Sequence, residues 1–300
     1  MTAIAPTVDH SITLPDGRLL LVRETGDPQG VPVVAHHGTP GSGVLFGPWA
    51  DDAAARGIRL ISYDRAGYGG SDRAAGRDVA AVAADVGAAL DALGVNHFMT
   101  WGASGGGPHA LACAALLPDR VRAVASIAGV APWDGENLDP MAGMGADNVE
   151  EFGLAVDGES VLRPWLDVQR RGILSATPDD LVEQMRSLLP PIDVAALGGA
   201  AGPYLLASMT GGLASGVDGW LDDDLAIVGP WGLDLDEVTA PVLVQQGGLD
   251  LMVPRSHGLW LAAHLPGATT WIEPNQGHLS LVLDLSRVHA WLLQRWHSEV

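Results

Sequence analysis

Lysine is absent from this 300-residue chain, so all 16 basic residues are arginine, and they face 36 acidic residues. The formal net charge is therefore -20 at pH 7. Nucleic acids and anionic lipid headgroups carry the same sign of charge and are repelled by such a surface. This balance argues against nucleic acid or a membrane as a partner, and it says nothing about chemistry.

Cysteine occurs once, at Cys113, which excludes an internal disulfide framework and a cysteine-rich metal site. No apolar run reaches the roughly 18 residues that a membrane-spanning helix needs. The first ten residues hold no basic cluster followed by an apolar segment, so no secretory signal is visible. The expected compartment is therefore cytoplasmic.

Short apolar runs alternate with longer helical patterns along much of the chain. The strand-like runs lie at residues 31–37, 59–63, 97–101, 121–127, 242–246 and 269–273. The helix-like segments between and after them lie at residues 49–56, 79–93, 108–117, 256–264 and 286–296. Parallel strands need such crossover helices, so the pattern predicts a mostly parallel, doubly wound α/β sheet. A β-hairpin over residues 11–23, with its turn at Pro15, Asp16 and Gly17, precedes it.

The alternation stops after Gly129 and resumes at Val242. Residues 131–235 contain amphipathic helical pieces with many Gly and Pro and no convincing strand. We therefore expect two parts of one core, residues 1–130 and 237–300, separated by a helical insertion at residues 131–236.

The sequence Gly102-Ala103-Ser104-Gly105-Gly106 follows a strand-like run and precedes a strongly apolar helix. This is the pattern of a nucleophile elbow, in which small flanking residues allow a sharp turn between strand and helix. Strand, turn and helix all occur as the motif requires, and the helix N-terminus favours developing negative charge. Ser104 is therefore the predicted nucleophile.

A serine hydroxyl needs a base, and that base needs a carboxylate to orient it. His278 lies in a loop after the last predicted strand, where the chain order Ser, acid, His puts the base. Asp250 follows the strand at residues 242–246 and is the predicted acid. Asp134, just after the strand at residues 121–127, is the rival acid.

Acyl transfer also needs hydrogen-bond donors for the tetrahedral oxyanion. The backbone N–H of Gly105 is one predicted donor. The second is the N–H of Thr39, in the loop after an earlier strand. His37, in the same loop, is interpreted as a structural residue that holds the loop by hydrogen bonds.

Together these residues resemble the α/β-hydrolase superfamily. The shared features are the loop at residues 37–41, the glycine-rich segment at residues 63–71, the Ser104 elbow, Asp250 and His278, in family order. The resemblance implies that residues 64–71 support the active site and that the insertion is a helical cap over the pocket. A serine at the elbow, where dehalogenases and epoxide hydrolases of this fold carry aspartate, favours ester-like acyl transfer. Gly107 is a third glycine that departs from the pattern.

We predict a serine hydrolase that cleaves an ester or lactone of a small, largely apolar molecule. Neither a metal nor an organic cofactor is required for this chemistry. The predicted substrate-binding residues are the cap side chains Trp133, Met144, Trp165 and Trp220.

Two alternatives remain open. The loop at residues 38–41 is similar to that of proline-type aminopeptidases, which bind the substrate amine with cap carboxylates, and Glu150 and Glu151 are available for this. The other alternative is a ligand-binding protein of the same fold without turnover, against which the complete set of three residues argues.

Overall fold

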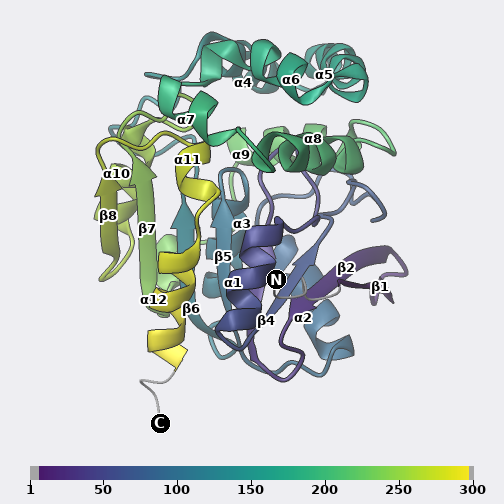
Figure 1. The fold of residues 1–300 in the computed structure, drawn as a ribbon, viewed down its shortest axis with the longest axis vertical. Helices are drawn as coiled ribbons and strands as arrows, with labels where there is room; N and C mark the ends of the chain where they lie inside the picture. Colours follow the sequence, from purple (N-terminus) through teal and green to yellow (C-terminus); the bar gives the residue numbers. More distant parts are fainter. Residues whose placement is uncertain (1–6, 297–300) are drawn as a thin grey trace.

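A computed structural model describes residues 7–296 of the chain. The first six residues, part of the segment without a signal pattern, and the last four lie outside the described residues. An eight-stranded sheet, ordered β1-β2-β4-β3-β5-β6-β7-β8, forms the centre of the molecule (Figure 1). The strands are β1 (Val8–Thr13), β2 (Leu19–Gly26), β3 (Val31–His36), β4 (Ile58–Tyr63), β5 (Phe98–Ala103), β6 (Val121–Ile127), β7 (Val242–Gly247) and β8 (Thr269–Glu273).

The hairpin β1–β2 pairs antiparallel with the sheet, and β3 to β8 run parallel to one another. This confirms the predicted hairpin and the mostly parallel sheet. Successive side chains of a strand point to opposite faces, so neighbouring apolar residues serve two cores. Val34 belongs to the core on one face, whereas Val33 and Ala35 belong to the core on the other.

Helices cover both faces of the sheet. The helices α2 (Val82–Ala92), α3 (Gly106–Leu116) and α10 (Arg255–His264) contribute to one core, and α1 (Gly47–Ala55) and α12 (Ser286–Trp296) contribute to the other. Each fully buried Val, Leu, Ile or Phe side chain contributes about 1.5–3 kcal/mol. The predicted doubly wound α/β architecture is thus confirmed, with one short extra helix, α11 (Leu279–Val282).

Six α-helices lie between β6 and β7 along the chain and form a layer above one end of the sheet in Figure 1. They are α4 (Ala146–Asp157), α5 (Glu159–Ser175), α6 (Pro178–Gln184), α7 (Pro191–Ala196), α8 (Ala201–Gly212) and α9 (Asp218–Val228). Thr177 and Asp180 form a capping box that starts α6. Leu162, Leu166 and Leu221 belong to a hydrophobic cluster of this layer, which gives it a core of its own. The predicted helical insertion is therefore present, and we call it the cap.

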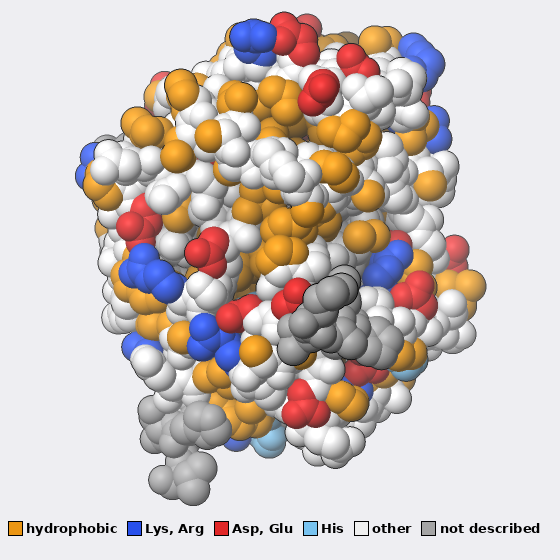
Figure 2. Space-filling view, in the orientation of Figure 1, with side chains coloured by type: hydrophobic (Ala, Val, Ile, Leu, Met, Phe, Trp, Pro, Cys, Tyr) orange, Lys and Arg blue, Asp and Glu red, His pale blue; other side chains and the backbone are white. Residues whose placement is uncertain are grey.

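Hydrophobic side chains gather over the upper half of the molecule, on the cap and where the cap meets the sheet layer (Figure 2). Exposed large hydrophobic residues on α4 and α5 include Val156 and Val168. Among residues 7–296, no helix is both long and apolar enough to span a membrane.

Candidate active site

Ser104 occupies the turn between β5 and α3, at the end of the sheet that faces the cap. Its backbone has a φ of 56°, a left-handed conformation that is rare for a residue with a side chain. The strand and helix approach so closely that a Cβ on Gly102 would collide with the backbone of Gly106, and one on Gly106 with that of His36. The glycines that flank the predicted nucleophile therefore have the steric role that the elbow motif requires.

His278 and Asp250 meet at the ends of the last two strands. The Nδ1 atom of His278 lies 2.8 Å from Oδ2 of Asp250, and both side chains are buried. The other Asp250 oxygen accepts hydrogen bonds from the N–H groups of Met252 (2.9 Å) and Val253 (2.8 Å). Asp134, the rival acid, is exposed. The structure thus brings the predicted base and the preferred acid together.

The Asp250 carboxylate also changes the proton affinity of His278. Burial alone would lower the pKa of the imidazole, but the charge and hydrogen bond of Asp250, helped by Asp193, outweigh burial and raise this pKa above its ordinary value of 6.5. Because Nδ1 is engaged by the carboxylate, Nε2 is the ring nitrogen that can exchange a proton with another group.

The two predicted oxyanion donors lie close together. A Cβ on Gly105 would come within 3.4 Å of the Thr39 nitrogen, and a Cβ on Gly38 would lie 3.3 Å from the Ser104 Cβ. The loop after β3 therefore rests against the elbow, with Gly105 at the N-terminus of α3. Backbone N–H groups at such a helix start favour negative charge beside the serine.

His37 holds this loop, as the sequence predicted. Its Nδ1 lies 2.8 Å from the Gly38 carbonyl and donates to it, while Nε2 accepts a hydrogen bond from the Arg65 N–H at 3.1 Å. Burial, and then the nearby Arg65 charge, lower the pKa of His37 well below its ordinary value. A neutral imidazole can donate one of these hydrogen bonds and accept the other, so the ring holds the loop in place. Arg65 belongs to the segment at residues 64–71, which therefore supports the site as expected.

A cavity of about 470 Å³ connects these groups with the cap. Ser104, His278, Thr39 and Gly105 lie on its wall, as do hydrophobic side chains from the core and the cap. A volume of this size holds a small organic molecule. The cap wall includes the predicted residues Trp165 and Trp220 together with Phe152, Ile173, Leu181, Met185, Leu205, Met209 and Ile227.

Trp133 and Met144 are not among the residues that line this cavity, which corrects their predicted role. They belong to a separate hydrophobic cluster, where the Trp133 ring packs 5.1 Å from the Phe152 ring, measured between centroids. The backbone after Met144 is tied to the core, because the Gly145 N–H donates to the Leu251 carbonyl at 2.7 Å. Both side chains thus pack beside the pocket, between the cap and the core.

Four acidic residues also line the cavity, at Asp147, Glu150 and Glu151 on α4 and at Asp224 on α9. Burial raises the pKa of Glu151 to about 7, even though the Trp220 Nε1–H donates to it at 2.6 Å. Burial and the neighbouring Glu151 raise the pKa of Asp224 well above its ordinary value. The sequence suggested Glu150 and Glu151 but missed Asp224, which lies in the run of three aspartates at residues 222–224.

Asp193, on α7 of the cap, is a second residue that the sequence did not reveal. Its carboxylate accepts hydrogen bonds from the backbone N–H groups of His278 (2.7 Å) and Ser280 (2.8 Å). The side chain is completely buried, and it occupies the space that a Cβ on Gly277 would need. A residue of the cap therefore fixes the backbone of the loop that carries the predicted base.

Replacement of Asp193 by alanine is expected to lower the free energy of unfolding by about 2–4 kcal/mol, because two N–H groups lose a charged acceptor. We also expect a lower kcat, since the His278 backbone loses its anchor. Urea unfolding and steady-state kinetics measure the two effects. Asp179→Ala, at an exposed carboxylate of the cap, is the control and should change stability by no more than about 0.5 kcal/mol. Unchanged stability and kcat in Asp193→Ala would contradict this role.

The third glycine of the elbow, Gly107, has a packing role. A Cβ there would lie 2.8 Å from both the Gly129 Cα and the Ser126 Oγ. Gly107 therefore lets the start of α3 pack against the end of β6.

Within residues 7–296, no three His, Cys, Asp or Glu side chains are grouped as ligands for a metal ion.

Comparison with known proteins agrees with the fold. The family model for the alpha/beta hydrolase fold matches residues 31–285. A non-heme chloroperoxidase of Streptomyces lividans is 35% identical over 124 residues, which are 41% of this chain and only 45% of that protein. A protein of Caulobacter sp. (strain K31) with the provisional name carbamate hydrolase RutD is 28% identical over 248 residues, which are 82% of this chain and 83% of that one.

Solved structures repeat the architecture over almost the whole chain. An alpha/beta hydrolase fold protein from Nakamurella multipartita superposes with a TM-score of 0.70 at 25% sequence identity. The superposition covers 96% of this chain and all of that one. Both the sheet and the cap are thus included in the shared fold.

Proposed function

Because this chain belongs to the alpha/beta hydrolase fold family and is an enzyme of that fold, we propose that it is a serine hydrolase. Its substrate is an ester or lactone of a small, largely apolar molecule. The observation that carries the proposal is the contact between His278 and Asp250 beside a cavity that Ser104 also lines. The apolar wall of that cavity supports the substrate class.

The reaction begins with attack of the Ser104 Oγ on the acyl carbon. Nε2 of His278 takes the serine proton, since Nδ1 is held by Asp250, and the imidazolium that forms is stabilised by that carboxylate. Ser104 and His278 line the same cavity, so Nε2 is the ring nitrogen open to the serine hydroxyl. The tetrahedral oxyanion accepts hydrogen bonds from the N–H groups of Gly105 and Thr39.

Collapse of the tetrahedral intermediate breaks the bond to the leaving group. His278 returns its proton to the departing oxygen, which leaves the acyl group on Ser104. A water molecule then attacks this acyl-enzyme, with His278 again acting as base, and the carboxylic acid is released. Ser104, His278, Thr39 and Gly105, which these steps use, all line one cavity.

A substrate panel tests the proposal. We expect hydrolysis of short aryl esters, lactones, or both, with kcat/KM rising as the acyl or alcohol part becomes more apolar. A panel in which no acyl substrate turns over would contradict the proposed function. Turnover of arylamides but not of esters would contradict the substrate class alone.

The pH dependence follows from the contact with Asp250. Neutral His278 is the active base, and its raised pKa means that it becomes protonated at a higher pH than an ordinary histidine. We therefore expect kcat/KM for a neutral ester to fall on the acid side with a midpoint above 6.5. Circular dichroism over the same pH range controls for unfolding. A midpoint at or below 6.5 would contradict the proposed role of Asp250.

A second candidate is hydrolysis of a substrate with a free amine, as in proline-type aminopeptidases. The observation that favours it is the carboxyl pair Glu151 and Asp224 on the cavity wall. Burial raises the pKa of both carboxyl groups, and Glu151 raises that of Asp224 further, whereas Asp224 lowers that of Glu151. The pair therefore binds one proton more readily than two separate carboxyl groups would, and it keeps one negative charge. That charge would attract an ammonium group.

Matched substrates separate the two candidates. Proline and cyclopentanecarboxylic acid, coupled to the same aryl alcohol or arylamine, differ mainly in the ring amine. Faster turnover of the amine-bearing compounds, abolished by Glu151→Gln, would favour the second candidate. Equal or slower turnover of those compounds would favour the ester or lactone hydrolase.

A further inference from the structure

The loop that carries the proposed oxyanion donor Thr39 is anchored by residues distant in sequence. On one side, Arg65 follows β4 and donates from Nη1 to the His37 carbonyl at 2.5 Å. Its Nη2 also lies 3.2 Å from the Thr39 Oγ1. These contacts fix the start of the loop against the sheet. Another contact holds Thr39 from the opposite side.

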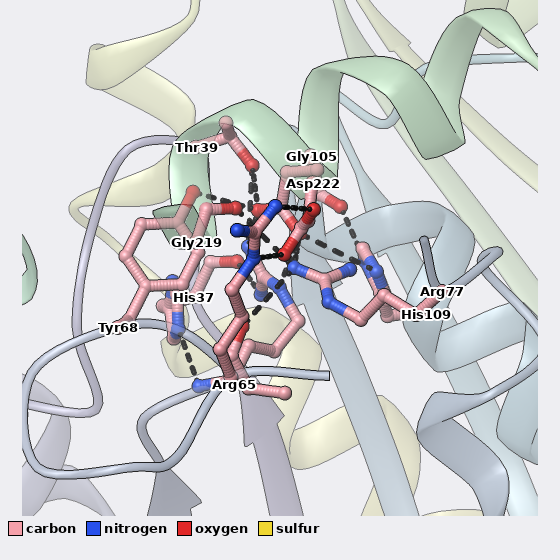
Figure 3. Close-up of polar contacts among 12 residues, drawn as sticks. His37, Thr39, Arg65, Tyr68, Arg77, Gly105, His109, Gly219 and Asp222 are labelled. Atoms are coloured by element: carbon pink, nitrogen blue, oxygen red, sulfur yellow. Dashed lines mark hydrogen bonds and ion pairs between the residues drawn. The ribbon is translucent and has the colours of Figure 1, made fainter. Parts of the chain in front are cut away.

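That contact comes from Asp223, on α9 of the cap. The Thr39 hydroxyl donates a hydrogen bond to Oδ2 of Asp223 at 2.5 Å, across 184 positions of sequence. The same oxygen accepts from Arg65 Nη2 at 2.5 Å and from the Tyr68 hydroxyl at 2.9 Å. Thr39, Arg65 and Tyr68 converge on this point in Figure 3.

The other carboxylate oxygen of Asp223 is equally well bound. Oδ1 accepts from Arg65 Nε at 3.1 Å and from Arg77 Nη2 at 2.6 Å. His109, whose Nδ1 contacts the Gly105 carbonyl at 2.7 Å, places its Nε2 3.8 Å from the same oxygen. Thr39 is thus bound directly to this carboxylate, whereas His109, which contacts Gly105, lies beside the carboxylate without a hydrogen bond to it.

The charges of this group require an ionised carboxylate. Asp223 and Arg65 are almost completely inaccessible to solvent. Burial alone would raise the pKa of Asp223, but Arg65 and Arg77 outweigh it and hold this pKa well below its ordinary value. Burial lowers the pKa of His109 to about 3, so its ring is neutral. Because two arginines face this one carboxylate, the group formed by Asp223, Arg65 and Arg77 places no net negative charge behind the oxyanion hole.

We propose that Asp223 is a positioning residue for the oxyanion hole, which it sets by holding the Thr39 side chain and the Arg65 guanidinium in one fixed arrangement. This inference rests on the proposed function, because it concerns the donors of that reaction. The cap then does more than enclose the substrate: its α9 helix completes the geometry of a loop that belongs to the core. Oxyanion donors act mainly in the transition state, so the loss of this anchor lowers kcat more than it changes KM.

Variants of both partners test the inference with a neutral aryl ester as substrate. Thr39→Val removes the hydroxyl, keeps the backbone N–H and preserves the side-chain shape, and should lower kcat about tenfold. Asp223→Asn should lower kcat about 10- to 100-fold, and KM should stay within about twofold in both variants. Thr39→Ser, which retains the hydroxyl, should restore kcat to within about threefold of the wild-type protein.

Asp222→Asn is the matched control. Asp222 is a buried neighbour on α9, but it binds Arg73, with Nε–Oδ2 and Nη2–Oδ1 distances of 2.8 and 2.9 Å. Its kinetic constants should equal those of the wild-type protein.

The outcomes are distinct. Wild-type kcat in Thr39→Val, or a change confined to KM, overturns the inference while esterase activity itself stands. Should Asp223→Asn fail to fold, the comparison of Thr39→Val with Thr39→Ser decides. A wild-type protein that hydrolyses no ester, lactone or amide overturns the proposed function and this inference together.

Discussion

Replacement of Ser104 by alanine is expected to lower kcat/KM for a short aryl ester by on the order of 10⁴-fold or more. The change removes the oxygen that attacks the acyl carbon of the substrate in the proposed mechanism. The fold should tolerate it, because the left-handed backbone at Ser104 is held by close contacts of Gly102 and Gly106 and not by the hydroxyl. Steady-state kinetics and urea unfolding measure the two expectations.

Ser256→Ala is the control for this variant. Ser256 follows the start of α10 and does not line the cavity, so its replacement should leave kcat/KM unchanged. Ester hydrolysis at the wild-type rate in Ser104→Ala would show that another group performs the attack.

Replacement of Asp250 by asparagine should lower kcat about 10³- to 10⁴-fold. Oδ1 of Asp250 accepts two backbone N–H groups, so the oxygen of an asparagine would stay on that side. Its NH₂ group would then face Nδ1 of His278 and require that nitrogen to be the acceptor. The ring proton would move to Nε2, which could no longer accept the proton of Ser104.

Asp134→Asn is the matched control for Asp250→Asn. Asp134 is the acid that chain order alone left as a rival, and its side chain is exposed. We expect wild-type kinetics in this variant. A large loss of kcat in Asp134→Asn together with a small one in Asp250→Asn would reverse the assignment of the acid.

The sheet could be predicted because its signals are local. Apolar runs such as residues 121–127 and 242–246 match the observed strands β6 and β7 to within one residue. The elbow is also local, since Gly102, Ser104 and Gly106 lie within five positions. Chain order then directs His278 and Asp250 to the same edge, because parallel strands end at the same edge of a sheet.

The contacts between the cap and the core could not be predicted from the sequence, because they join residues that are far apart along the chain. Asp193 lies 85 positions from its partner His278, and Asp223 lies 184 positions from its partner Thr39. No periodicity of the sequence relates either aspartate to its partner. An aspartate in an amphipathic helix ordinarily faces solvent, and nothing local distinguishes Asp223 from its neighbours. The sequence could not show that Trp133 and Met144 pack beside the cavity and do not line it, because a large apolar side chain fills a core as readily as a pocket wall.

Reaction with a fluorophosphonate probe, followed by peptide mass spectrometry, tests the central claim most directly. An activated serine forms a covalent phosphonate with such a probe, whereas an ordinary serine hydroxyl does not. We expect one modified residue, Ser104, and loss of labelling in His278→Ala. An unlabelled wild-type protein, as expected of a ligand-binding protein without turnover, or a label on another residue would contradict the account.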